Sequence, residues 1–198
     1  TGKTETGPKV CDSRTFPPSM RHCVPGRRRY TGSMSKNISF FFDYADGEFD
    51  GESFNGPSLM ATLDCLTAQA AAGTDTWEGY SAWSVAIHVA YYKYYFVRAI
   101  RGQDRAGVFP YAKDQHGFGD PPEVTAEAWV EMRAYLRKIH RAVMDALVEL
   151  GPERFAETMP RWDMPYGKAV AWLLNHDAYH AAQIRNMGVP GLREKRST

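Results

Sequence analysis

The feature that most constrains this chain is residues 168–187, which carry two histidines on the apolar side of a predicted helix. Pro165 suits the first helical turn, Asp163 can cap it, and Gly188 followed by Pro190 predicts its end. The apolar side of such a helix must be buried against other elements, so the two imidazoles on it need hydrogen-bond or metal partners inside a core. At helical spacing the stripe consists of Ala169, Leu173, His176, His180, Ile184 and Met187.

His176 and His180 are four residues apart, so their side chains lie one above the other on the helix. That spacing allows both imidazoles to bind one metal ion at about 2.0–2.1 Å. Ordinary hydrogen bonding inside the core would satisfy the same two rings. The helix alone leaves both alternatives open.

Two further long helices are predicted. One spans residues 80–101, where Ser81 can cap the start and Gly102 ends the helix. The other spans residues 123–150 and is opened by Pro122. Its apolar stripe recurs at three-and-four spacing through Trp129, Met132, Leu136, Ile139, Val143, Leu147 and Leu150.

The segments between these helices are less regular. We expect one helix within residues 55–73, with Pro57 in its first turn and Gly73 after its end. Residues 35–55 are compatible with a short helix or a strand, which the acidic, glycine-bearing part then breaks. The composition of residues 102–122 predicts a long loop, and loops of this length often form a lid or one side of a functional site. No strong strand is evident in the second half, so we predict an all-α helix bundle.

Charge and cysteine content restrict the partners. The formal net charge is +1, so neither nucleic acid nor an anionic membrane is expected as a partner. No run approaches the roughly 18 apolar residues that a membrane span requires. The three cysteines, Cys11, Cys23 and Cys65, are widely spaced and odd in number. We therefore expect no disulfide framework, a reducing compartment and a cytoplasmic location.

Residues 1–33 differ from the rest of the chain. They are rich in proline, lack periodicity and contain three consecutive arginines, Arg27 to Arg29. We expect an irregular N-terminal arm or leader without a fold of its own, followed by one helix-bundle domain over residues 34–198. His22, Cys23 and Cys11 match no usual zinc spacing.

A third imidazole is available on the helix predicted for residues 80–101. His88 there, together with His176 and His180, would form a three-histidine site. Three protein ligands and one open position are typical of a catalytic zinc ion rather than a structural one. The alternative is three core histidines that hydrogen-bond to tyrosine and backbone groups.

Three segments carry a family resemblance: GPSLMATLDCLT, WEGYSAWSVAIHVAYYK and NHDAYHAAQI. Together with the order of one histidine, a long gap and His-x3-His, they make residues 34–187 resemble the DinB/YfiT-like superfamily of four-helix-bundle metalloproteins. The resemblance implies that His88, His176 and His180 bind one divalent metal ion, usually zinc or nickel. Two features depart from the pattern: the first long helix is hard to place, and residues 1–33 have no counterpart.

The resemblance also implies a function. Characterised members are thiol-dependent, either S-transferases using bacillithiol or glutathione or a mycothiol-dependent isomerase. We therefore expect a metal-dependent enzyme acting on a small molecule, with a low-molecular-weight thiol cofactor. A metal-dependent hydrolase is the next alternative, and a non-catalytic, stress-related metal-binding dimer is the competing class. Family habit and the aromatic residues Phe40 to Phe42 suggest a homodimer.

Asp177 follows His176 directly and forms an H-D-x-x-H pattern like that of the zincin proteases. A zincin needs a third ligand after this helix, where only Glu194 is available, so a protease is disfavoured. Asp177 is instead a candidate general base or an acceptor for a histidine N–H, with a solvated carboxylate as the alternative. Tyr92, one turn after His88, is the other candidate for proton transfer.

Several more residues are candidates for the surroundings of the site. Gln183 lies one turn after His180 and is either a hydrogen-bond partner near the metal or a surface residue. We expect His140 to lie at the surface rather than to act as a fourth ligand, His116 to be exposed, and Cys65 to be a small core residue. The pocket wall is predicted to include Ser84, Tyr91 and Tyr95.

Overall fold

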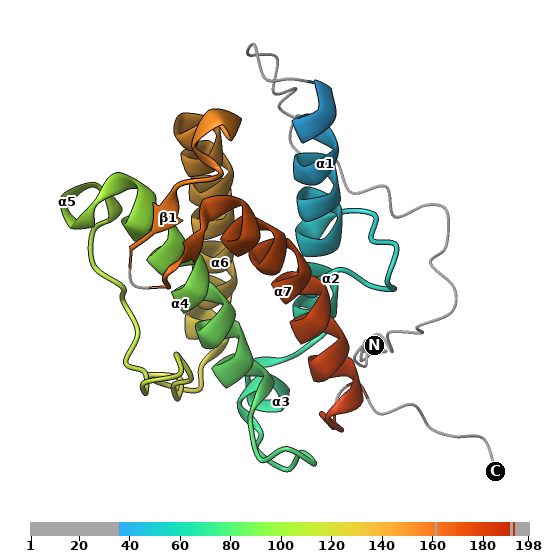
Figure 1. Ribbon diagram of the computed structural model, residues 1–198. Helices are drawn as coiled ribbons and strands as arrows, with labels where there is room; N and C mark the ends of the chain where they lie inside the picture. The colour runs from blue at the N-terminus through green and yellow to red at the C-terminus, as the bar shows by residue number, and fades with distance from the viewer. Residues whose placement is uncertain (1–35, 161, 191, 193–198) are drawn as a thin grey trace, which may run out of the picture.

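The computed structural model describes residues 36–160, 162–190 and 192 (Figure 1). Within them the long helices are α1 (Lys36–Asp50), α4 (Ala82–Arg101), α6 (Ala126–Leu150) and α7 (Tyr166–Asn186). Shorter helices are α2 (Leu59–Asp64), α3 (Ala68–Ala72), α5 (Gln103–Ala106) and a 3₁₀ helix (Pro152–Arg154). Two antiparallel strands of two residues each, β1 (Thr158–Met159) and β2 (Met164–Pro165), precede α7. The fold is an all-α bundle, which confirms the predicted class.

The helix α4 is central to the bundle. It packs against α6 on one side and α7 on another, while α7 also packs against α1 and α2. In Figure 1, α7 crosses diagonally between the green α4 and the blue α1. The residues buried most completely include Trp83 and Phe96 of α4 and Trp129 and Leu136 of α6. Burial of these large side chains holds α4 in a fixed position, and α4 carries one of the candidate metal ligands.

The predicted ends of α4 are confirmed, and the predicted start of α6 is wrong. Ser81 Oγ accepts the backbone N–H of Ser84 at 2.9 Å, and Gly102, at φ 80°, ends α4. The helix α6 begins at Ala126 and is capped by Thr125, so Pro122 and Glu123 lie before it. The helix begins after Thr125 because the Thr125 side chain accepts the backbone N–H of Ala128, which would otherwise lack a partner at the helix start. All seven stripe residues of α6 are buried as predicted.

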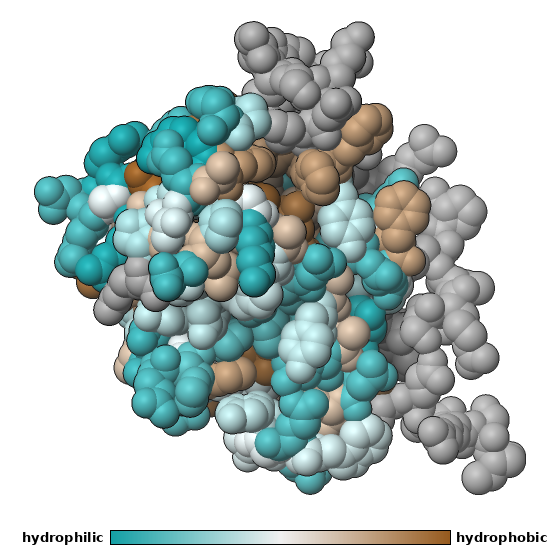
Figure 2. All heavy atoms as spheres, viewed as in Figure 1, coloured by the Kyte–Doolittle hydropathy of each residue, from teal (hydrophilic) through white to brown (hydrophobic). Residues whose placement is uncertain are grey.

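The segment that the sequence left ambiguous is one continuous helix, α1. Phe42, Ala45 and Phe49 lie on its buried face at three-and-four spacing, so packing overrides the glycine and the acidic residues within it. Phe40 and Phe41 remain 73% and 55% exposed. Figure 2 shows apolar atoms gathered over α1 on a face that is otherwise largely hydrophilic.

The single helix expected within residues 55–73 is two short ones, α2 and α3. Ser58 Oγ caps α2 through the N–H of Ala61, and Thr67 Oγ1 caps α3 through the N–H of Ala70. Pro57 lies before the helix rather than in its first turn. Two capping side chains nine residues apart favour two starts instead of one long helix.

The start of α7 is stabilised by backbone groups rather than by Asp163, which corrects the predicted cap. The N–H of Tyr166 donates to the carbonyl of Glu157, and the N–H of Gly167 donates to that of Phe155, both at 2.9 Å. The short hairpin before α7 thus satisfies the first free donors of the helix. Asp163 lies in the turn of this hairpin with φ 48°.

Cys65 is partly buried and is disulfide-bonded, whereas we expected free cysteines; Cys11 and Cys23 lie outside the described residues. The argument for a reducing compartment and a cytoplasmic location therefore loses this support. The predicted arm over residues 1–33 and Glu194 also lie outside the described part of the chain. Within that part, none of the helices has the length and hydropathy needed to cross a bilayer.

Candidate metal centre

Three imidazoles from two helices converge in the bundle. His88 comes from α4, and His176 and His180 come from α7; the three side chains are 8%, 6% and 4% exposed. Each offers one ring nitrogen, and these nitrogens all lie within 4.8 Å of one another. The Nε2 atoms of His176 and His180 are 3.0 Å apart. The packing of α7 against α4 therefore creates a buried three-nitrogen site.

The ring of His88 is oriented by the loop between α5 and α6. Its Nδ1 lies 2.8 Å from the backbone carbonyl oxygen of His116. A carbonyl can only accept, so Nδ1 carries the proton and Nε2 keeps its lone pair for a metal. Phe118 of the same loop stacks on the His88 ring at a centroid distance of 4.1 Å. The side chain of His116 is exposed, as expected, but its backbone contributes to the site.

The ring of His180 is oriented by Gln183. Its Nδ1 lies 2.6 Å from Gln183 Oε1, and Gln183 Nε2 in turn donates to the carboxylate of Glu78. This arrangement again places the proton on Nδ1 and leaves Nε2 free. Gln183 is partly buried and bonded to a ligand candidate, so the surface alternative is wrong.

His176 supplies the test of whether the site fits a cation. Its Nδ1 is buried without a hydrogen-bond partner, and its Nε2 faces the Nε2 of His180, which keeps its lone pair. A proton on the Nε2 of His176 satisfies this pair, but the buried Nδ1 of His176 is still left without a partner. A divalent cation would be bound by all three lone pairs at once, so the donor set fits such an ion.

All three imidazoles are neutral at pH 7, which is the form that binds metals. Burial and the neighbouring His88 lower the pKa of His180 to about 4. Burial, followed by the rings of His180 and His88, holds the pKa of His176 far below its ordinary value. Burial also lowers the pKa of His88, against the opposing effect of its bond to the His116 carbonyl.

Aromatic side chains surround the three imidazoles. Tyr92 makes edge contacts with His88 and His176, at centroid distances of 4.8 and 5.5 Å. Trp172 lies 4.4 Å from His176, and Tyr179 lies 4.9 Å from His180. Trp172 and Tyr179 are 40% and 64% exposed, so this aromatic collar extends from the buried imidazoles to the surface.

The other predicted pocket residues make contacts away from the three imidazole rings. Tyr91 packs against the loop, where its ring lies 3.9 Å from the Lys113 ammonium. Tyr95 is buried and stacks on Trp162 at 5.4 Å. Ser84 is buried one turn before His88, where its backbone N–H completes the cap of α4. Of the predicted tyrosines, Tyr92 is the one in ring contact with the candidate ligands.

Asp177 is buried and paired, so the solvated alternative is wrong. Its Oδ2 accepts from Lys93 Nζ at 2.6 Å, and both side chains are almost fully inaccessible to water. Lys93 also donates to His140 Nδ1 at 3.0 Å. The carboxylate therefore takes part in an ion pair between α7 and α4. A carboxylate bound to an ammonium group is less available to act as a general base.

His140 lies in the core, which corrects the expectation of a surface histidine. Its ring stacks on Phe49 at 3.8 Å, and its Nε2 donates to Asp46 at 3.0 Å. Burial, and then the Lys93 ammonium, keep the pKa of His140 well below its ordinary value. His140 is absent from the group of potential ligands around His88, so it is not placed as a fourth one.

Sequence reasoning missed several residues around the centre. Trp172 lies one turn before His176, so helical spacing was a usable signal for it. Lys93 is five residues after His88 and was obscured by the tyrosines on either side. His116, Phe118 and Glu78 reach the site from loops, and no local pattern indicates where a loop folds back.

Comparisons with known proteins agree with this architecture. A family model described as the DinB superfamily matches residues 57–184, a stretch that includes all three histidines. No curated protein matches the chain. No solved structure matches it either.

Proposed function

This chain belongs to the DinB superfamily, and we propose that it is a divalent-metal-dependent transferase that uses a low-molecular-weight thiol as its nucleophile. The observation that carries the proposal is the set of three buried, neutral imidazoles. Among the described residues, no carboxylate, thiol or fourth imidazole joins this group. Three protein ligands and an open position are typical of a catalytic zinc ion, and three histidines are one such set.

A divalent ion, zinc or nickel by family resemblance, would supply Lewis acidity and lower the pKa of the attacking thiol. The chain itself supplies the orientation. The His116 carbonyl and the Gln183 amide hold the Nε2 atoms of His88 and His180 toward the site. The collar of Trp172, Tyr179 and Tyr92 provides apolar surface for an organic substrate and limits the access of water.

In the proposed reaction, the thiolate sulfur forms a bond to an electrophilic carbon of the small-molecule substrate. The leaving group departs with the bonding electron pair, and the proton of the thiol passes to solvent or to a base. Tyr92 is the titratable side chain in edge contact with His88 and His176, and it is the candidate for proton transfer. Burial raises the pKa of Tyr92, so the phenol stays protonated at neutral pH; it would donate a hydrogen bond or its proton to the leaving group rather than accept the proton of the thiol.

The pairing of Asp177 favours a transferase over a hydrolase. A metal-dependent hydrolase commonly uses a carboxylate general base beside the ion to deprotonate water. The acid next to His176 in sequence is instead held by the Lys93 ammonium at 2.6 Å. A thiol is far more acidic than water and needs no such base once its pKa is lowered.

We also propose that the protein is a homodimer in which a second copy covers the exposed side of α1. Phe40 and Phe41 are more than half exposed, and neighbouring apolar atoms are visible in Figure 2. Exposed aromatic side chains grouped on one helix mark interaction surfaces more often than scattered ones do.

The function is tested by incubating metal-loaded protein with glutathione, bacillithiol or mycothiol and 1-chloro-2,4-dinitrobenzene as electrophile. Conjugate formation that requires both the metal and one of these thiols is the expected result. The His176→Ala variant should lose it, whereas the control His116→Ala, which alters an exposed ring, should retain it. Metal-dependent ester hydrolysis without a thiol would instead indicate a hydrolase. One bound metal ion per chain, with neither thiol conjugation nor ester hydrolysis, would indicate a non-catalytic metal-binding protein.

A further inference from the structure

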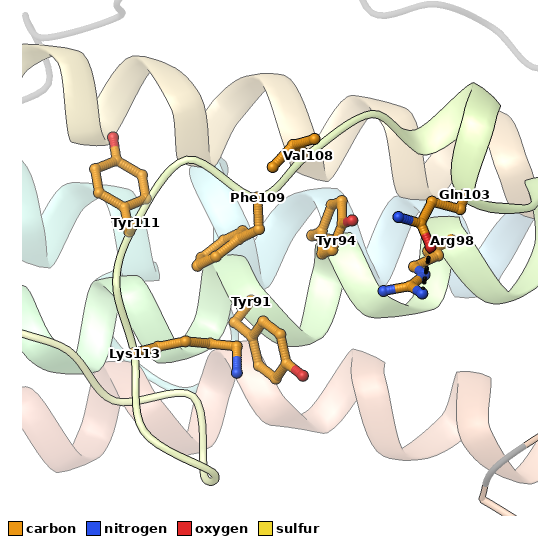
Figure 3. Close-up of a pocket in the computed structure, with 8 residues that line it drawn as sticks. All are labelled: Tyr91, Tyr94, Arg98, Gln103, Val108, Phe109, Tyr111 and Lys113. Carbon is orange, nitrogen blue, oxygen red and sulfur yellow. Dashed lines mark hydrogen bonds between the residues drawn. The ribbon is translucent and has the colours of Figure 1, made fainter.

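A hollow of about 420 Å³ lies between α4 and the chain segment that follows it. This volume is within the range of small-molecule sites. Figure 3 shows Lys113 beside Tyr91 and Arg98 beside Gln103, with aromatic rings between the two cations. We call this hollow the α4 groove. Its principal lining residues are Tyr91, Tyr94, Arg98, Phe109, Tyr111 and Lys113.

Two cationic side chains, Arg98 and Lys113, line the α4 groove. No Asp or Glu is among the residues that line it. Arg98 donates to the neutral amide oxygen of Gln103 at 2.6 Å. Lys113 donates to the backbone carbonyl of Asp114 at 3.2 Å and lies over the Tyr91 ring. Within the described part of the chain, neither cation forms an ion pair with a carboxylate.

The next arginines along the chain behave differently. Arg101 and Arg105 both pair with Glu149, at 2.7 and 3.1 Å. Arg98 differs from these two arginines because its guanidinium donates to a neutral amide and not to a carboxylate. A concave site with two such cations attracts anions.

The walls of the α4 groove are aromatic and hold one another in place. Phe109 contacts Tyr91 and Tyr94 at centroid distances of 5.4 and 5.5 Å, and Tyr111 at 5.8 Å. The Tyr94 hydroxyl donates to the Gly107 carbonyl at 2.9 Å, which fixes the start of the loop against α4. Rings held in this way form an apolar surface suited to a flat, apolar molecule.

From this combination we infer that the α4 groove binds a small aromatic carboxylate. Its ring would lie against Tyr91, Tyr94 and Phe109, and its carboxylate would be bound by the Arg98 guanidinium, which suits a planar anion. Lys113 would add a second positive charge at the edge. The inference does not depend on the metal centre, because none of the three histidines lines the groove.

The test compares two probes of the same shape, 2-naphthoate and its uncharged analogue 2-naphthamide, by isothermal titration calorimetry. The wild-type chain should bind naphthoate and prefer it over naphthamide by about tenfold or more. Arg98→Gln and Lys113→Gln should each remove most of this preference and leave naphthamide binding unchanged. Arg105→Gln, an exposed arginine outside the groove, is the matched control and should bind like wild type.

A second arm repeats the titration with excess EDTA, since a carboxylate can also bind a metal ion. Naphthoate binding in the α4 groove should persist under chelation. Three results would overturn the inference: no saturable naphthoate binding up to about 1 mM, equal affinity for the two probes in wild type, or loss of binding on chelation. Thermal unfolding of each variant checks that it is folded. If Arg98→Gln does not fold, Lys113→Gln, which alters an exposed residue, provides the test.

Discussion

The three candidate ligands are held in different ways. His88 and His180 each have a hydrogen bond on Nδ1, to a backbone carbonyl and to a side-chain amide. His176 has no such bond and is held by packing against Trp172 and Tyr92. The site therefore depends on the Gln183 side chain and on the backbone carbonyl of His116, neither of which is a ligand, and the dependence on Gln183 can be measured.

Replacing Gln183 with alanine removes the acceptor that orients His180. We expect the affinity for zinc to fall about 10- to 100-fold, the usual effect of losing such a partner. Asn175→Ala is the control, since Asn175 is exposed on the same helix and its side chain donates to the Ala171 carbonyl. Competition with a chromophoric chelator measures both. Equal affinities for Gln183→Ala and wild type would remove the assigned role.

Burial of the histidines predicts a pH dependence of stability. The pKa values of His88, His140, His176 and His180 are all lowered in the folded chain. As the pH falls below about 6.5, the unfolded chain binds protons that the folded chain does not. The free energy of unfolding should then fall with decreasing pH, by up to about 1.4 kcal/mol per pH unit for each such histidine.

Urea unfolding of EDTA-treated protein at pH 7.5, 6.5, 5.5 and 4.5 measures this dependence. Stability should fall by about 0.3–0.4 kcal/mol per histidine between pH 7.5 and 6.5 and more steeply below pH 6.5, with the contribution of His180 levelling off near its folded pKa of about 4. Constant stability down to pH 4.5 would mean that these imidazoles are not buried in the neutral form.

The ligand pair on α7 was predictable from the sequence because its signal is local. A spacing of four residues on an apolar stripe is sufficient to suggest it. The roles of His116 and Phe118 were not predictable, because a loop must fold back across α4 to bring them to His88. Asp177 and His140 were misjudged for a related reason, since each is paired inside the core with Lys93, which lies on another helix.

At the scale of elements, the contact between α4 and α7 positions the site, and a buried ion pair holds it. Lys93 of α4 binds Asp177 of α7, one residue after His176. His140 of α6 and Asp46 of α1 extend the same chain of hydrogen bonds. One polar network therefore joins all four long helices beside the candidate metal ligands.

Breaking this pair from one side should be costly. Lys93→Met leaves a buried carboxylate, and Asp177→Leu leaves a buried ammonium, so each should lower the free energy of unfolding by about 3–5 kcal/mol. The double variant Lys93→Met/Asp177→Leu should lose clearly less than the sum of the two single effects, because it leaves no uncompensated charge. Arg154→Gln, which breaks an exposed pair with Glu157, is the control and should have no measurable effect. Additive losses in urea unfolding would show that the pair is not coupled.

The helices that the sequence predicted best, α4, α6 and α7, have caps or glycine ends and long apolar stripes. The helix α1 was missed because Gly47, Gly51 and the acidic residues around them indicate a break, although Phe42, Ala45 and Phe49 have helical spacing. Tertiary packing decides such a segment, and one sequence does not reveal the partner surface.

At the scale of the whole molecule, the proposed homodimer predicts a self-association that depends on α1. Sedimentation velocity at micromolar concentration should give a dimer for wild type. Phe40→Ser/Phe41→Ser should shift it to monomer, because both side chains are exposed in the single chain. Trp77→Ser, which alters an aromatic side chain that is 80% exposed outside α1, is the control. A wild-type monomer at these concentrations would exclude the dimer.

The most direct test of the whole account is metal analysis of the purified chain and its histidine variants, after loading with zinc or nickel and removal of excess ion. We predict one divalent ion per chain in wild type and in the control His116→Ala. His88→Ala, His176→Ala and His180→Ala should each lose it while remaining folded. A wild-type chain that retains no ion, or variants that retain it as wild type does, would contradict the assignment of these three imidazoles as a metal centre.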